Sequence, residues 1–444
     1  READVLIADG RIAQIRSEID AGDEVIDASG LLVLPGVVDP HTHLLLDTGT
    51  ARTADDFESG SRSAAAGGVT TYIDFAPQRS GQRFAQALQS RLDLIEGRSY
   101  VDYALHLIIA QLPPGWEADL ADVVKAGVTS AKVYTTYRDT MFYADDWTWY
   151  RLMERSGDAG FLVQVHAEND AIVEGMSKQL VDEGKRSLKY HGVARPEVAE
   201  VEAVGRGLLF SRATGSPVYF VHLSTPRGVD LIEDARRSGV SAIAETCPHY
   251  LVLDDSRYDQ PDAARYIMTP PLRTLKSQSQ LWDRLSRGAI QSIGSDHCGF
   301  SLSQRAGVDD FRAISPGIPG VETSLLLMHS FGVVPGRISR SNLVRLLSTN
   351  PAKIFGLWPR KGDLQPGSDA DVVLFDPRPT RTLTAADLHS RAGFTPYEGL
   401  TVVGRVHTTI VRGRVIYRDG AIVGDRGFGR FLKCSPFNPE MVRG

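Results

Sequence analysis

Apolar, β-rich segments alternate with amphipathic helical segments between about residues 37 and 360, and this alternation constrains the fold more than any other feature. Such a pattern favours parallel strands joined by crossover helices. A strand that ends at His41 has seven successors of the same character: Thr70–Phe75, Ala104–Ile109, Ser130–Tyr134, Leu162–Val165, Val218–Val221, Ile243–Glu245 and Ile290–Ser295. Eight such strands are the number in a TIM barrel, whose site lies where the strands end.

Helices are predicted between most of these strands, over Phe57–Ala66, Phe84–Ile95, Tyr150–Ala159, Glu197–Thr214, Val229–Ser238 and Gln278–Arg287. An open, doubly wound sheet is the competing architecture. No glycine-rich phosphate fingerprint follows the first strand, so the barrel is the better interpretation of the pattern. We therefore expect an α/β protein with a TIM barrel over residues 37–360.

The two ends of the chain carry short strands joined by glycine turns. Val5–Ala8 and Arg11–Ile15 flank an Asp-Gly pair, which is typical of a two-residue hairpin. Because isolated hairpins are marginally stable, we expect residues 1–36 and 361–427 to form one small discontinuous β-sandwich. Residues 428–444 then form a C-terminal tail, either ordered or disordered, or an arm for subunit contact.

Composition excludes several classes of protein. A net charge of −6 gives no reason to expect nucleic acid as a partner. Neither an apolar run of about 18 residues nor a basic-then-apolar leader is visible, so neither a membrane span nor a signal peptide is expected. Cys247, Cys298 and Cys434 are far apart and fit no disulfide framework or thiolate zinc motif, as in a reduced, cytoplasmic protein.

Two histidines one residue apart end the first barrel strand. Residues i and i+2 of a strand face the same side, so His41 and His43 can share one metal ion. An isolated pair of this kind is more often a polar strand end. His166 and His222 close two further apolar strands in the same way, and this repetition favours metal ligands over hydrogen-bonded core residues.

Asp296 and Lys132 are the remaining ligand candidates. Asp296 follows the last strand, where a carboxylate can hold an ion and accept a proton from water, although a helix cap or salt bridge is the alternative. Burial would keep Lys132 neutral, and a neutral amine can take up carbon dioxide as a carbamate that bridges two cations. Its side chain could equally extend to solvent or pair with an acid. The adjacent His297 receives no firm role.

Motifs in the same order extend over nearly the whole chain: Leu34-Pro-Gly-Val-Val-Asp-Pro-His-Thr-His43, Asp55-Asp-Phe-Glu-Ser-Gly60, Ala66-Gly-Gly-Val-Thr-Thr71, Lys132-Val-Tyr134, Val165-His-Ala-Glu168, His222-Leu-Ser-Thr225, Glu245-Thr-Cys-Pro-His-Tyr250 and Gly294-Ser-Asp-His297. Together they resemble the amidohydrolase superfamily, in its dihydropyrimidinase and D-hydantoinase branch.

The resemblance implies a metal-dependent hydrolase with two divalent ions, commonly zinc, in a TIM barrel. His41, His43 and Asp296 would hold one ion, His166 and His222 the other, and a carboxylated Lys132 would bridge both. A hydroxide between the ions would open a cyclic amide or imide, such as a dihydropyrimidine or 5-substituted hydantoin, to an N-carbamoyl amino acid, while Asp296 transfers the proton. Members of the family commonly form homotetramers.

Substrate contacts are also implied by the resemblance. Tyr137 matches a tyrosine that hydrogen-bonds the oxyanion or the substrate carbonyl. Thr269 and Pro316 stand where a serine and an asparagine hold the substrate ring through backbone groups. Proline has no N–H, so a contact at Pro316 must use its carbonyl.

Two other functions fit parts of the pattern. An allantoinase or a dihydroorotase is also a cyclic amidase, but dihydroorotase-like sequences place an arginine shortly after the paired histidines, where this chain has Leu44, Leu45 and Leu46. A non-catalytic scaffold of the same fold is the second alternative. Such scaffolds typically lack metal ligands that are present here.

Overall fold

The computed structural model describes residues 3–20, 22 and 24–442. At its centre is a sheet of eight parallel strands whose order in space follows their order in the chain. The strands are β4 (Val37–Thr42), β5 (Val69–Pro77), β6 (Asp102–Ile108), β7 (Ser130–Tyr134), β8 (Leu162–His166), β9 (Val218–Phe220), β10 (Ala242–Thr246) and β11 (Ser292–Ile293).

The first and last strands of this sheet meet and close the barrel. Thr42, at the end of β4, forms a parallel bridge with His297, and the His43 amide donates to the His297 carbonyl at 2.8 Å. The predicted TIM barrel is therefore confirmed. The last strand is shorter than the predicted Ile290–Ser295, because only Ser292 and Ile293 keep the ladder register with β10.

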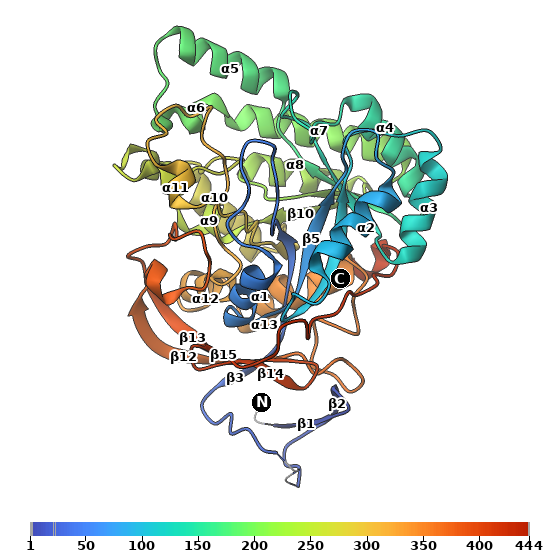
Figure 1. The fold of residues 1–444 in the computed structure, drawn as a ribbon, viewed down its shortest axis with the longest axis vertical. Helices are drawn as coiled ribbons and strands as arrows, with labels where there is room; N and C mark the ends of the chain where they lie inside the picture. Colours follow the sequence, from blue (N-terminus) through green and yellow to red (C-terminus); the bar gives the residue numbers. More distant parts are fainter. Residues whose placement is uncertain (1–2, 21, 23, 443–444) are drawn as a thin grey trace.

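Helices surround the barrel (Figure 1). Those between successive strands are α1 (Phe57–Ala66), α2 (Phe84–Ile95), α3 (Trp116–Ala126), α4 (Asp146–Ser156), α5 (Asp170–Asp182), α6 (His191–Ala194), α7 (Glu197–Thr214), α8 (Pro226–Arg237), α9 (Pro248–Val252) and α10 (Leu275–Ser286). The shorter helices α11 (Leu302–Arg305), α12 (Ser324–Met328), α13 (Arg340–Val344) and α14 (Asn350–Ile354) follow β11.

Three predicted helices, α1, α2 and α7, have the predicted bounds, whereas α3 and α5 were not predicted at all. The helix predicted from Tyr150 begins earlier, at Asp146, because the Asp145 side chain accepts the Thr148 amide and caps it. Helix α3 starts after Gly115 without a side-chain cap, so its sequence carries no start signal.

Strands from both ends of the chain form two antiparallel sheets that pack below the barrel (Figure 1). One is the hairpin of β1 (Asp4–Ala8) and β2 (Arg11–Arg16). The other has five strands: β3 (Leu32–Pro35), β12 (Val372–Thr382), β13 (Thr401–Val411), β14 (Arg414–Arg418) and β15 (Ala421–Ile422). The predicted pairing of the two ends is confirmed.

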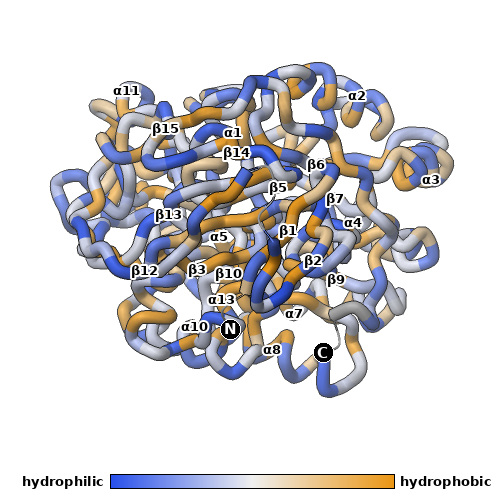
Figure 2. Tube along the Cα trace, turned by 90° about the horizontal axis from the view of Figure 1, so that it is seen from below, coloured by the Kyte–Doolittle hydropathy of each residue, from blue (hydrophilic) through white to orange (hydrophobic). Residues whose placement is uncertain are grey.

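Alternation along β12 explains this layering. Val372 and Leu374 pack with Ile12 of the hairpin, whereas Val373 and Phe375 belong to the main core of the barrel. Because successive side chains of a strand point to opposite faces, the five-stranded sheet is apolar on both. Hydrophobic residues accordingly concentrate among the central strands (Figure 2).

The described part of the C-terminal tail, residues 428–442, runs along the barrel. Its Gly429 amide donates to the Ser99 carbonyl at 2.9 Å, and its Leu432 amide donates to Tyr103 at 2.7 Å. The Cys434 amide donates to the Gly127 carbonyl at 2.9 Å. All of these partners lie at or before the beginning of a barrel strand, at the end opposite the histidines.

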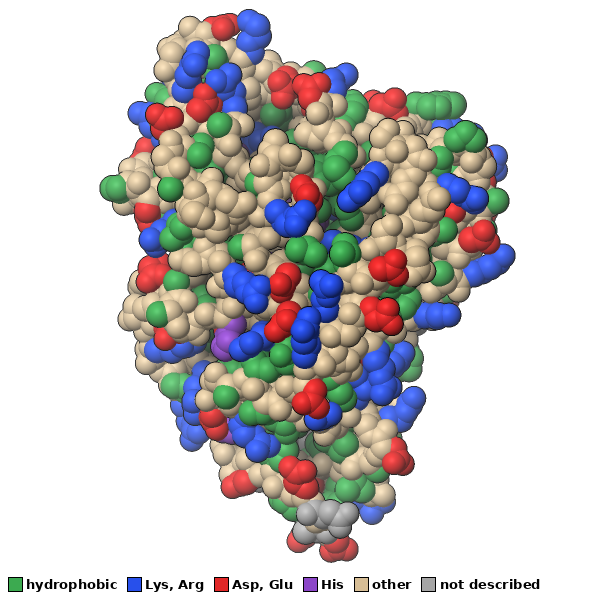
Figure 3. Space-filling model, in the orientation of Figure 1, with side chains coloured by type: hydrophobic (Ala, Val, Ile, Leu, Met, Phe, Trp, Pro, Cys, Tyr) green, Lys and Arg blue, Asp and Glu red, His purple; other side chains and the backbone are tan. Residues whose placement is uncertain are grey.

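The surface carries charges of both signs (Figure 3), and the three cysteines are buried. Side chains of both charges are interspersed over the face seen in Figure 3. Cys247, Cys298 and Cys434 are buried and unpaired. Among the described residues, no helix is both long and apolar enough to cross a membrane.

Candidate metal centre and active site

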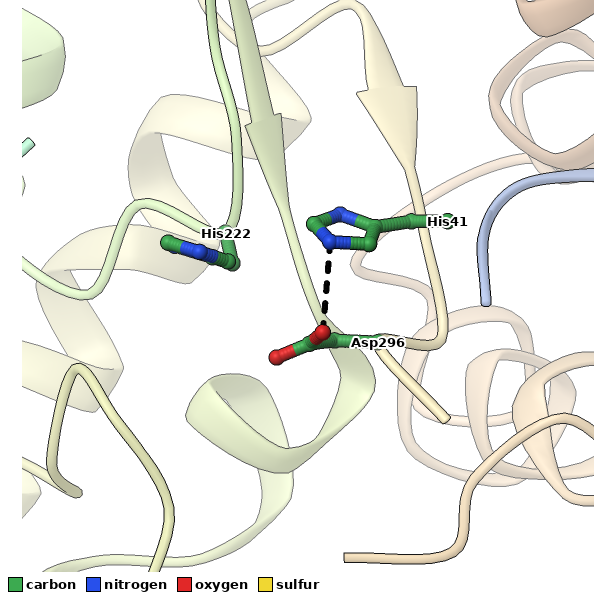
Figure 4. A group of neighbouring side chains, drawn as sticks. All are labelled: His41, His222 and Asp296. Carbon is green, nitrogen blue, oxygen red and sulfur yellow. Dashed lines mark ion pairs between the residues drawn. The ribbon is translucent and has the colours of Figure 1, made fainter. Parts of the chain in front are cut away.

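The structure brings all six predicted metal ligands to one place at the carboxyl ends of the barrel strands. The Nε2 atoms of His41 and His43 lie 3.2 and 3.3 Å from Oδ1 of Asp296. Figure 4 shows His41, His222 and Asp296 converging from separate elements. Donor atoms of these three buried residues all lie within 4.8 Å of one another.

His166 and His222 form the other half of the group. Nδ1 of His166 lies 3.0 Å from Nε2 of His222. The rings of His41 and His222 are stacked with their centroids 5.3 Å apart, so the two halves are contiguous.

Lys132 lies inside the group and not at the surface. Its Nζ is 2.8 Å from Nε2 of His41 and lies over the rings of Tyr134 and Phe75, at 4.7 and 5.0 Å from their centroids. The alternative in which Lys132 extends to solvent is therefore wrong, since the residue is 1% exposed. Burial lowers the pKa of Lys132 to about 8, which increases the share of neutral amine.

The chemistry of these side chains fits divalent metal ions. Burial lowers the pKa of His43 to about 4 and those of His41 and His222 well below the usual value, so the rings stay neutral and offer lone pairs. Two ligands at 2.0–2.2 Å from one ion lie about 3 Å apart. The separations among the facing nitrogen and oxygen atoms, 2.8–3.3 Å, match this value.

Two buried glutamates orient the imidazoles. Oε1 of Glu245 is 2.8 Å from Nδ1 of His41 and also accepts the His222 amide at 2.9 Å. Oε2 of Glu168 is 2.7 Å from Nε2 of His166. Each carboxylate fixes the outer nitrogen of a ring and leaves the inner nitrogen for a metal, which is the usual arrangement around metal-binding histidines.

The sequence interpretation missed the roles of both glutamates. Glu168 and Glu245 lie inside motifs that were recognised, but a carboxylate near a strand end is equally compatible with a helix cap or a salt bridge. The sequence signal that could have identified them is their position relative to the histidines. Glu168 follows His166 by two residues, and Glu245 ends a strand beside the one that leads to His222.

Tyr137 and Thr269 meet at the edge of the group. The Tyr137 hydroxyl hydrogen-bonds Oγ1 of Thr269, and its ring lies 5.6 Å from that of His166. Burial raises the pKa of Tyr137 to about 12, so the hydroxyl keeps its proton at neutral pH and can donate it. Pro316 is half-buried and precedes Gly317, whose amide donates to the Ile267 carbonyl, two residues before Thr269.

Backbone strain concentrates at the same place. Tyr137, His222 and Asp296 have φ angles of +72°, +39° and +48°, and Leu45, just beyond His43, has +49°. Residues other than glycine rarely adopt this left-handed region, and when they do they are often found at functional sites.

Comparison with known proteins identifies the family of this chain. Residues 32–416 match the model of the amidohydrolase family. A D-hydantoinase from Geobacillus stearothermophilus is 40% identical over 99% of this chain and 95% of its own. A D-phenylhydantoinase from Escherichia coli is 39% identical over 99% of this chain and 96% of its own.

Among solved structures, the dihydropyrimidinase of Brevibacillus agri NCHU1002 superposes with a TM-score of 0.96 at 39% identity, and the match covers 98% of this chain and 96% of that one. Sequence and fold therefore agree over nearly the full length. The chain belongs to the amidohydrolase family, in the branch that contains the hydantoinases and dihydropyrimidinases.

Proposed function

We propose that this amidohydrolase opens a cyclic amide or imide ring, a 5-substituted hydantoin or a dihydropyrimidine, to an N-carbamoyl amino acid. One observation carries the proposal: four buried imidazoles, Lys132 and Asp296 converge at the mouth of the barrel. The relatives named hydantoinase and dihydropyrimidinase cover almost the whole chain, which supports the same substrate class.

We propose that two divalent metal ions bind within this group of six side chains, and that the metal is zinc. His41, His43 and Asp296 would hold one ion, and His166 and His222 the other. Lys132, as its carbon dioxide adduct, would contact both. When bound, such ions supply hydroxide at neutral pH and polarise a carbonyl.

Side chains and backbone groups of the protein transfer the proton, stabilise the developing negative charge and bind the ring. Asp296 accepts the proton of the attacking hydroxyl group and returns it to the ring nitrogen as the C–N bond breaks. Tyr137 donates its hydroxyl proton in a hydrogen bond to the carbonyl oxygen as negative charge develops there. The backbone around Thr269 and the Pro316 carbonyl would hold the ring.

The alternatives have less support. The matched relatives carry hydantoinase names, which does not favour an allantoinase or a dihydroorotase. A non-catalytic scaffold does not account for six ligand candidates in one buried group, in which Glu245 and Glu168 orient the rings of His41 and His166.

We also propose that the protein is a cytoplasmic homotetramer, which a measurement of its mass in solution would test. The unpaired thiols support a reducing compartment. Exposed apolar side chains on neighbouring helices, Trp147 on α4 and Val198 and Leu209 on α7, support subunit contact.

Ring opening by the zinc-loaded protein tests the proposal. The panel contains dihydrouracil, 5-substituted hydantoins of both hands, allantoin and dihydroorotate. We expect turnover of a hydantoin or dihydrouracil, and none by Asp296→Asn, which keeps the size of the side chain but cannot accept the proton. Turnover of allantoin or dihydroorotate alone, or of nothing in the panel, would contradict the proposed substrate class.

A further inference from the structure

His297 and Asp55 form a buried pair beside the candidate metal centre that the proposed reaction does not use. Nε2 of His297 lies 3.1 Å from Oδ2 of Asp55, and both side chains are at most 1% exposed. Asp55 lies just before helix α1, and His297 directly follows Asp296. The pair therefore joins two segments that are 242 residues apart in the chain.

The hydrogen bonds determine which ring nitrogen carries the proton. Nδ1 of His297 accepts the backbone amides of Gly320 and Val321, at 3.1 and 3.3 Å. An imidazole nitrogen that accepts cannot also carry a hydrogen, so the proton is on Nε2, which donates to Asp55. The ring is thus fixed on both sides.

The Asp55 carboxylate is fully used by this network. Oδ2 accepts from His297 and from the Ser390 hydroxyl, while Oδ1 accepts the Ser59 hydroxyl at 2.8 Å and the Arg391 amide at 2.9 Å. Ser390 and Arg391 lie in the loop between β12 and β13. A segment of the terminal β domain therefore reaches over the barrel to Asp55.

The backbone of His297 touches the metal centre on two sides. Its carbonyl accepts the His43 amide at 2.8 Å. Its own amide donates to Oγ of Ser295 at 3.2 Å, and that hydroxyl also lies 3.2 Å from the His41 carbonyl. Between Ser295 and His297, Asp296 is held in the left-handed region. The His297 ring and the backbone on both sides of Asp296 are therefore held in one hydrogen-bond network.

We propose that the Asp55–His297 pair is a positioning device that holds Asp296 against His41 and His43, and that the loop around Ser390 completes it. Neither residue is among the proposed metal ligands or substrate contacts. This inference rests on the proposed function only for its kinetic consequence, since the placement of Asp296 also affects metal binding without substrate.

Asp55→Asn is the variant that tests the pair. An amide has a single acceptor oxygen, so at least two of the four donors around Asp55 lose a partner, while the size of the side chain is kept. Asp56→Asn is the matched control. Asp56 caps α1 and pairs with the half-exposed Arg391, and asparagine caps helices equally well.

Two readouts follow. The first is the visible absorption spectrum of the apo-protein titrated with Co²⁺, which reports ligand geometry without turnover. The second is the division of the kinetic effect between kcat and KM for the best substrate in the panel. We expect Asp55→Asn to change the cobalt spectrum and to lower kcat by about 10–100-fold with little change in KM, as for other residues that orient metal ligands. Asp56→Asn should match the wild type in both.

A folded Asp55→Asn protein with the wild-type cobalt spectrum and kcat would overturn the inference. If that variant does not fold, His297→Gln is tested by the same two measurements. Glutamine can place an amide N–H near Asp55, but it leaves the Gly320 and Val321 amides without the ring nitrogen that accepts them. A wild-type protein that binds cobalt but opens no cyclic amide would contradict only the proposed function. The cobalt spectra of the variants would still test whether the Asp55–His297 pair positions Asp296.

Discussion

At the scale of single residues, the chemistry depends on groups that are buried yet kept reactive. Burial leaves the histidines neutral and shifts the pKa of Lys132 down to about 8. Glu168 differs, because burial raises its pKa but the charge of Arg195 and the hydrogen bond from His166 outweigh this and hold the pKa at about 2. Glu168 therefore remains ionised and orients the ring of His166.

Lys132→Ala removes the side chain at the centre of the group. We expect the loss of metal and of ring opening, with partial recovery when short carboxylic acids are added, because they can replace a bridging carbamate. Metal analysis and turnover with and without acetate measure this. Lys125→Ala, on the exposed face of α3, is the control, and full activity of unrescued Lys132→Ala would exclude Lys132 as a ligand.

Tyr137→Phe removes only the hydroxyl. Because loss of one donor to a developing oxyanion costs about 10²–10³-fold in kcat, we expect a fall of that order with the metal content unchanged. Steady-state kinetics measure the effect, with Tyr143→Phe on the same loop as the comparison. A kcat within about threefold of the wild type would remove Tyr137 from the proposed role.

Five of the six ligand candidates could be picked out from the sequence because they lie at or just after the ends of barrel strands. Lys132 lies in the middle of β7, and its proposed role came from the family resemblance. The sequence was not sufficient for Glu168, Glu245 or Asp55. Their roles depend on which oxygen faces which nitrogen, and Asp55 acts through His297, which is 242 positions away. Contacts of this kind are set by tertiary packing and leave no local pattern.

At the scale of elements, the strands were predicted better than the helix starts. A buried parallel strand is a continuous apolar run. By contrast, α3 begins without a side-chain cap, and the start of α4 depends on a single capping residue, Asp145. The connection between α1 and β5 shows how closely these elements pack. A Cβ at Gly67 would lie 2.6 Å from the Cα of Glu322.

Gly67→Ala should therefore destabilise the protein, by about 1–3 kcal/mol, because a backbone neighbour cannot move aside. Gly175→Ala is the matched comparison, since a Cβ there meets nothing within 4 Å and Gly175 lies inside helix α5. That change should be neutral or stabilise by up to about 1 kcal/mol. Urea unfolding compares the two, and equal stabilities would contradict the close packing at Gly67.

At the scale of the whole molecule, a buried ion cluster joins the barrel to the terminal sheets. Nζ of Lys361 lies 2.7 Å from Asp102, at the start of β6, and 2.7 Å from Asp371, just before β12. Asp369 is a third partner at 3.1 Å. Removal of the central cation is costly, because it leaves buried negative charge without full compensation.

Lys361→Met removes the cation that these three carboxylates share, so that Asp371 loses its ion pair while Asp102 and Asp369 keep Arg412 and Arg360. We expect a loss of stability of about 3–5 kcal/mol, measured by urea or thermal unfolding. Lys276→Met, at an exposed position, should change stability by less than about 0.5 kcal/mol. A Lys361→Met protein as stable as this control would show that the cluster does not hold the two parts together.

Removal and restoration of metal tests the central claim most directly. The protein is stripped with a chelator, then reloaded with zinc in the presence or absence of bicarbonate, and hydantoin ring opening is followed. The account predicts an inactive stripped protein, and restoration that requires both bicarbonate and about two zinc ions per chain. Undiminished ring opening by the metal-free protein would contradict it.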